Sequence, residues 1–322
     1  MLFNMLHRMR NIIWLICFLV VSLCSCDKQQ AGTLTGDTVC VTVCIDNGRT
    51  RAVGSYDAKE DAMNGIQLFC FDAGGTLEKY ISPSGITGAS VSLNLTKGVK
   101  HMYAAVNCPD LSSIATEQEL LDTRSRFDNN SLDGGFEMFG SVNVEVTGAE
   151  KVTIRPKRIV AKVVVMKIVA DFEEPGFRSD DFVVTNIYLG NVAKSTDYGM
   201  STVPSEYYVG GDVENSDAVN AMIYEGGLSV NLKDGGSSSV EHGFYVYPNS
   251  SANSTRLILK ATLRGQTQTF SFALPDIERN TVYQIDQIRI SKPSDSSLTP
   301  EINFTITVAP WEPAVQHFNY SY

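Results

Sequence analysis

The chain has 322 residues, of which 43% are hydrophobic and 19% are charged, so it can bury a sizeable core and lacks the composition of a disordered protein. This length suggests two domains or one large one. The formal net charge is -10, and an acidic surface repels phosphate, which argues against nucleic acid as a partner.

The first 26 residues have the pattern of an export signal. Basic residues precede an apolar run from Ile12 to Leu23 that is shorter than the roughly 20 residues needed to span a bilayer. The run ends at Ser25-Cys26, which resembles a bacterial lipobox. We therefore expect residues 1–26 to be a lipoprotein signal peptide, with lipid attached to the Cys26 thiol. Ordinary secretion with cleavage nearby is the alternative.

A regular strand is predicted directly before a basic segment. Its apolar residues alternate with threonine and cysteine, a period of two that is typical of a half-buried strand. These apolar residues are Val39, Val41, Val43 and Ile45. The polar segment after it carries Arg49 and Arg51-Ala52, where a trypsin-like protease could cut. We interpret residues 27–51 as a segment with a strand that is removed by proteolysis.

Many further short strands follow, separated by turn residues. They are expected at 66–72, 76–81, 90–95, 99–107, 136–146, 151–155, 182–189, 243–247, 255–263, 268–273, 282–290 and 301–308. Such a pattern predicts a mainly β protein with two β-sandwiches. A capping box of Thr116 and Glu119 predicts one short helix over residues 116 to about 126. Residues 191–240 are expected to be irregular.

A nearly continuous apolar run over 158–170 is expected either to be buried centrally in a sheet or to lie at a domain junction. We therefore predict an N-terminal sandwich over 27–157 and a C-terminal sandwich over 158–322.

The C-terminal tail also alternates like a strand, although chain ends are usually frayed and polar. Its apolar and aromatic positions are Ile302, Phe304, Ile306, Val308, Phe318, Tyr320 and Tyr322. Trp311 lies between the two alternating stretches, and a lone tryptophan of this kind is expected to be a core or interface anchor.

The sequence contains no catalytic or cofactor-binding motif, so we expect neither an enzyme nor a cofactor. The histidines of the exported chain, His101, His242 and His317, are isolated. No calcium-loop spacing occurs, and no metal is expected.

Four cysteines follow Cys26, and they are expected to be free buried thiols. Cys40 and Cys44 lie too far apart along one strand to form a disulfide bond. A bond between Cys70 and Cys108 remains possible but has no support in the sequence.

Several short motifs, in order along the chain, resemble those of the FimA-type fimbrillins, subunits of the Bacteroidales type V pilus. The motifs are the lipobox at Cys26, the strand before Arg51-Ala52, Gly140-Ser141 after Met138, Arg158 to Lys162, Ile277 to Asn280 with Tyr283, and Thr307 to Trp311.

The resemblance implies two transthyretin-like β-sandwich domains and export as an outer-membrane lipoprotein. It also implies that a protease cuts after an arginine that follows the first strand. Loss of that strand would open a groove for the C-terminal strand of another subunit, here residues 302–322. Because Arg49 stands close to Arg51, the site of cleavage stays open.

General physical principles support strand exchange of this kind. A missing strand leaves an edge of unpaired backbone groups, and such an edge captures an extended segment. The predicted function is a polymerising structural subunit of a cell-surface fimbria. Its expected partners are other fimbrial subunits, a processing protease and, before processing, the outer membrane. The alternative is a non-polymerising surface lipoprotein, either an accessory or tip adhesin or a glycan-binding module.

Overall fold

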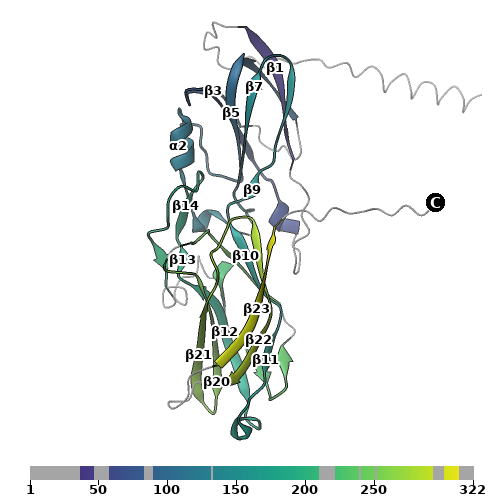
Figure 1. Ribbon diagram of the computed structural model, residues 1–322, viewed down its shortest axis with the longest axis vertical. Helices are drawn as coiled ribbons and strands as arrows, with labels where there is room; N and C mark the ends of the chain where they lie inside the picture. The colour runs from purple at the N-terminus through teal and green to yellow at the C-terminus, as the bar shows by residue number, and fades with distance from the viewer. Residues whose placement is uncertain are drawn as a thin grey trace, which may run out of the picture. The chain divides into compact units, whose positions relative to one another are not determined.

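The computed structural model describes residues 37–46, 58–82, 90–131, 133–209, 222–238, 241–250, 252–292 and 301–311, without the side chains of 128 and 301–303. All the strands discussed below belong to one compact unit, Thr38–Tyr322 (Figure 1). The predicted mainly β architecture with one short helix is confirmed.

Apart from one short strand described below, the strands before residue 159 form two facing sheets. The smaller sheet has the order β4-β1-β8 and comprises β4 (Ser90–Thr96), β1 (Thr38–Ile45) and β8 (Glu150–Ile154). The larger has the order β3-β2-β5-β7-β9 and comprises β3 (Leu77–Ile81), β2 (Ile66–Asp72), β5 (Gly98–Val106), β7 (Met138–Val146) and β9 (Lys157–Arg158). Alternate side chains of both sheets meet in one apolar core, as in a β-sandwich.

The later strands form a second pair of sheets around a larger core. One sheet has the order β18-β11-β22-β10-β19, with β23 on β22, and comprises β18 (Ser237–Ser238), β11 (Ile168–Ala170), β22 (Thr281–Lys292), β10 (Ala161–Val165), β19 (His242–Val246) and β23 (Glu301–Pro310). The other comprises β16 (Tyr224–Glu225), β12 (Phe182–Gly190), β17 (Val230–Leu232), β20 (Arg256–Leu263) and β21 (Gln266–Ala273).

Two small ladders complete the β-structure. They join β13 (Val192–Ala193) to β15 (Tyr207–Tyr208), and β14 (Ser195–Asp197) to β6 (Arg124–Arg126). The expectation that 191–240 is wholly irregular was therefore wrong where these strands and β16 to β18 occur. Three short 3-10 helices, η1 (Ala58–Asp61), η2 (Phe127–Asn129) and η3 (Pro175–Phe177), also lie among the described residues.

The helix α2 (Glu117–Asp122) is shorter than predicted. Its start is correct, because Thr116 and Glu119 form the expected capping box. Its predicted end was wrong: Thr123 is extended, and the next residues pair with β14 as β6. A tertiary strand pairing has thus overridden the helical pattern.

Candidate functional site

Strand β1 lies in the centre of its sheet and joins two strands that do not pair with each other. It runs antiparallel to β4, with Val39 opposite Leu95, and parallel to β8, with Val43 opposite Val152. Among the described residues, β1 is the only ladder partner of either strand. The integrity of this sheet therefore depends on β1.

The inner face of β1 contributes directly to the core. Val41, Val43 and Ile45 are buried, and they pack in one cluster with Leu93 of β4 and Ile154 of β8. The opposite face, with Cys40 and Cys44, is half-buried. This confirms the predicted period-two strand and its orientation.

The end of β1 is held by backbone and ionic contacts. The Asp46 amide donates to the Ile154 carbonyl over 3.1 Å, and the Asp46 carboxylate pairs with the Arg155 guanidinium at 3.2 Å. The next described residue is Ala58. Cys26 and the processing candidates Arg49, Arg51 and Ala52 lie outside the described residues.

Where the described chain resumes, η1 is fixed by a buried group of charges. The Lys162 Nζ lies 2.7 Å from the Glu60 Oε1, which also accepts a hydrogen bond of 2.6 Å from the Tyr245 hydroxyl. The Arg158 guanidinium pairs with Asp61 and donates to the Glu60 carbonyl over 2.9 Å.

Part of this buried group of charges is visible in the sequence, although the alternation that predicts strands gives its members no role. Arg158 and Lys162 are cations within an apolar run, and such residues are rarely buried without a partner. Glu60 and Asp61, which supply the partners, lie in an otherwise ordinary polar segment.

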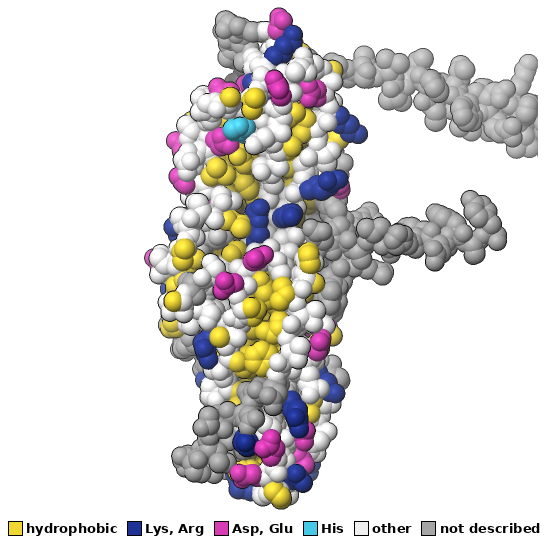
Figure 2. Space-filling model, in the orientation of Figure 1, with side chains coloured by type: hydrophobic (Ala, Val, Ile, Leu, Met, Phe, Trp, Pro, Cys, Tyr) yellow, Lys and Arg dark blue, Asp and Glu magenta, His cyan; other side chains and the backbone are white. Residues whose placement is uncertain are grey.

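Strand β23 carries the first half of the predicted donor tail and lies on β22 (Figure 1). The backbones of Ile302, Phe304, Ile306 and Val308 are opposite β22 residues. The Phe304 ring packs against Phe272 with centroids 4.5 Å apart, Ile306 is half-buried, and Val308 is 54% exposed. Figure 2 shows hydrophobic side chains gathered over this part of the face.

Trp311, directly after β23, is fully buried and fixes the strand at its end. Its ring stacks on Tyr245 at 6.0 Å between centroids, and the Arg158 guanidinium lies 4.3 Å from its centre. The Trp311 amide donates to the Asn280 carbonyl over 2.7 Å. The prediction of an anchoring tryptophan is confirmed, while Phe318, Tyr320 and Tyr322 lie outside the described residues.

The described cysteines, Cys40, Cys44, Cys70 and Cys108, are all free. Burial raises the pKa of the Cys70 thiol to about 12, and it also raises the pKa of the Cys108 thiol. Both of these thiols are therefore protonated and inert at neutral pH.

The sequence suggested that the histidines are isolated, but both described histidines lie beside a glutamate. The His101 Nδ1 lies 2.8 Å from the Glu117 carboxylate, and the His242 Nδ1 lies 2.6 Å from that of Glu225, while His317 lies outside the described residues. Among the residues described, no group of three metal-ligating side chains comes together. The described part of the chain also contains no helix long and apolar enough to cross a bilayer.

Comparison with known sequences gave no match to a family model or to a curated protein. Solved structures, in contrast, share the fold. A candidate cell adhesion protein from Parabacteroides distasonis ATCC 8503 matches with a TM-score of 0.65 at 18% identity, covering 88% of this chain and 99% of that one.

Two proteins of Porphyromonas gingivalis are also similar. The fimbrilin FimA from strain W83 matches with a TM-score of 0.61 at 13% identity, covering 87% of this chain and 99% of that one. The tip fimbrial protein Mfa3, with a C-terminal truncation, matches with a TM-score of 0.53 at 15% identity, covering 85% of this chain and all of that one. The chain thus has the fold of fimbrilins and related cell adhesion proteins.

Proposed function

We propose that this chain is a structural subunit of a cell-surface fimbria that polymerises by donor-strand exchange. The observation that carries the proposal is the position of β1, which is the only link between β4 and β8 among the described strands and directly precedes the segment with Arg49 and Arg51. A central strand that is followed in the sequence by a basic segment is a strand that proteolysis can separate from the rest of the chain.

Removal of residues 27–51 would leave the facing edges of β4 and β8 without hydrogen-bond partners. It would also uncover Leu93 and Ile154, which β1 now covers. Burying the three inner side chains of β1 contributes roughly 1.5–3 kcal/mol each, so a replacement strand with the same alternation has a strong driving force.

The C-terminal segment 302–322 is our candidate for the replacement strand. Its two alternating stretches, Ile302 to Val308 and Phe318 to Tyr322, match the alternation of β1. Insertion into another subunit is a head-to-tail contact that does not close on itself, so it builds a filament.

The precursor would be held in the outer membrane by lipid on Cys26 and released when the protease removes the strand. In this arrangement the chain has two β-sandwich domains, 27–157 and 158–322, of which the first accepts a strand and the second donates one. The proposed protein is structural and not an enzyme.

One observation favours the alternative of a non-polymerising surface lipoprotein, such as an accessory or tip adhesin or a glycan-binding module. Strand β23 is paired with β22 along its length and is anchored by Trp311. A chain that keeps this strand in place would bind through its surface and would not elongate a filament.

Cleavage and assembly can be tested on the purified full chain with trypsin. We expect loss of the segment that ends at Arg49 or Arg51, shown by N-terminal sequencing, and a ladder of multimers on a gel. Single Arg49→Gln and Arg51→Gln variants identify the cut, and Arg124→Gln serves as the control. Complete cutting that yields only monomer would exclude polymerisation by this route.

Two further variants identify the donor. Truncation after Trp311 keeps β23 and removes the second alternating stretch, whereas Gln284→Cys with Thr307→Cys places two thiols opposite each other in β22 and β23.

If Ile302 to Val308 must insert into another subunit, oxidation of the cysteine pair blocks assembly and reduction restores it. If the truncated chain fails to assemble and the oxidised pair assembles, Phe318 to Tyr322 is the donor. Assembly of both would refute the donor assignment.

A further inference from the structure

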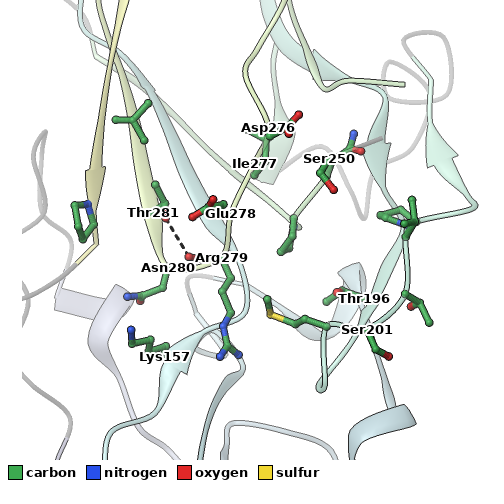
Figure 3. Close-up of a pocket in the computed structure, with 18 of the residues that line it drawn as sticks. Lys157, Thr196, Ser201, Ser250, Asp276, Ile277, Glu278, Arg279, Asn280 and Thr281 are labelled. Carbon is green, nitrogen blue, oxygen red and sulfur yellow. Dashed lines mark hydrogen bonds between the residues drawn. The ribbon is translucent and has the colours of Figure 1, made fainter. Parts of the chain in front are cut away.

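A pocket of about 750 Å³ lies beside the turn that precedes β22 (Figure 3). The turn contributes Asp276 to Thr281, and the segment after β14 and the end of β23 close the pocket. This volume falls in the range of roughly 300–1,000 Å³ that is typical of small-molecule sites.

Arg279 stands out among the lining residues. Its Nη1 is buried without a hydrogen-bond partner, and its guanidinium makes no ion pair with any described residue. Partial burial lowers the pKa of this guanidinium. Arg279 is only partly buried and lines the pocket, so its guanidinium, which pairs with no described residue, is available to an anionic ligand there.

The turn holds Arg279 in place before any ligand arrives. The Tyr283 hydroxyl accepts from the Glu278 amide and donates to the Asp276 carbonyl, both over 2.8 Å. Ile277 is buried and exchanges two backbone hydrogen bonds with Asn249, of 2.9 and 3.0 Å. A fixed turn of this kind reduces the entropy that binding would otherwise cost.

The remaining polar groups are arranged on two sides of the pocket. In Figure 3, the Arg279 side chain extends away from Glu278 and toward the side that holds Lys157. Asp276, Glu278 and the hydroxyl of Ser250 are exposed on the rim. A guanidinium fork recognises a carboxylate, whereas rim carboxylates and hydroxyls accept hydrogen bonds from a polyol.

We propose that this pocket binds an acidic sugar, with the sugar carboxylate on Arg279 and the sugar hydroxyls on Asp276, Glu278 and Ser250. The exposed side chain of Val308 provides an apolar contact for the C–H face of the ring. This site is remote from β1 in sequence, but Val308 to Pro310 line it, so the inference applies to the chain in which β23 is paired with β22.

Calorimetric titration of the full chain tests the proposal, with N-acetylneuraminic acid and glucuronic acid as probes and glucose and acetate as references. We expect both acidic sugars to bind at least about tenfold more tightly than glucose or acetate, because neither reference offers both a carboxylate and a set of hydroxyls. Arg279→Gln should weaken acidic-sugar binding at least about tenfold, and Arg279→Lys should weaken it less.

Thermal unfolding separates binding from a structural role. Arg279→Gln removes a partly buried charge that pairs with no described residue, so its melting temperature should equal or exceed that of the parent. The matched control is Arg256→Gln, since Arg256 already donates to Ser271 over 2.7 Å and should not affect sugar binding. Absence of binding to both acidic sugars, equal binding of acetate, or unchanged binding by Arg279→Gln would overturn the proposal.

Discussion

The ion pair between Glu60 and Lys162 is almost completely buried, with exposed side-chain fractions of 1% and 3%. A buried pair contributes little beyond an apolar pair of the same shape, but the loss of one partner leaves the other charge unpaired. Lys162→Met should therefore lower the free energy of unfolding by roughly 3–5 kcal/mol in urea denaturation.

The control is the double variant Glu60→Met and Lys162→Met, which removes both charges together. It should recover most of the loss, even though the Tyr245 hydroxyl then loses its acceptor. If the double variant is less stable than Lys162→Met alone, the pair itself stabilises the fold and this expectation is wrong.

Trp311 is the second residue whose removal should be costly. Trp311→Ala leaves a cavity against Tyr245 and Phe136 and removes the aromatic face beneath Arg158. We expect a loss of about 3–5 kcal/mol in the free energy of unfolding. Val308→Ala, at the exposed position, should change it by less than about 0.5 kcal/mol, and comparable losses in both variants would argue against Trp311 as the anchor.

Among the elements, β7 approaches the segment after β8 closely at Gly140. A Cβ atom at this position would lie 2.7 Å from the Arg155 carbonyl oxygen and 2.8 Å from the Pro156 Cα. Since both are backbone atoms, Gly140→Ala should cost roughly 1–3 kcal/mol in urea denaturation.

Gly148 provides a matched control for Gly140, because no atom lies within 4 Å of a Cβ built there. Gly148→Ala should leave the denaturation midpoint nearly unchanged. A destabilised Gly148→Ala with an unaffected Gly140→Ala would mean that the close approach is absent in solution.

The alternation of side chains predicted most strands of the fold correctly, because each strand reflects a local pattern of burial. It predicted the neighbouring strands of the hairpin at 66–72 and 76–81, but not which strands pair when they are far apart in the chain. The pairing of β1 with β8 joins Ile45 to Ile154 across more than a hundred residues, and nothing local encodes it. The same holds for α2, whose early end depends on the distant strand β14.

The same distinction between local pattern and distant partner applies to the residues of the candidate site. The inner face of β1 and the anchoring role of Trp311 were readable from residue type and spacing. The partners of Arg158 and Lys162 were not, because Glu60 and Asp61 resemble any exposed acidic pair in sequence. The isolation of Arg279 inside a pocket is visible only when every neighbouring side chain has been placed.

For the molecule as a whole, Cys70 would report whether the proposed groove opens. It belongs to the same buried cluster as the inner face of β1, and burial is the main cause of its raised pKa of about 12. In the intact chain, Cys70 should resist alkylation at pH 8, because almost no thiolate is present.

Removal of the segment before Ala52 should lower this pKa toward its usual value and make Cys70 reactive, as mass spectrometry of the alkylated protein can measure. Assembly into multimers should protect it again. Cys40 and Cys44 leave with the removed strand and therefore do not interfere. A Cys70 that stays unreactive in the cleaved monomer would mean that no groove opens.

The mixed pairing of β1 has a consequence for the filament. Since β1 is antiparallel to β4 and parallel to β8, the two flanking strands run in opposite directions. An incoming strand therefore meets one parallel and one antiparallel neighbour whichever way it enters, and backbone hydrogen bonding does not choose between the two directions. In the proposed strand exchange, side-chain fit along the groove would decide it, so the apolar residues of the donor would specify the polarity of the fibre.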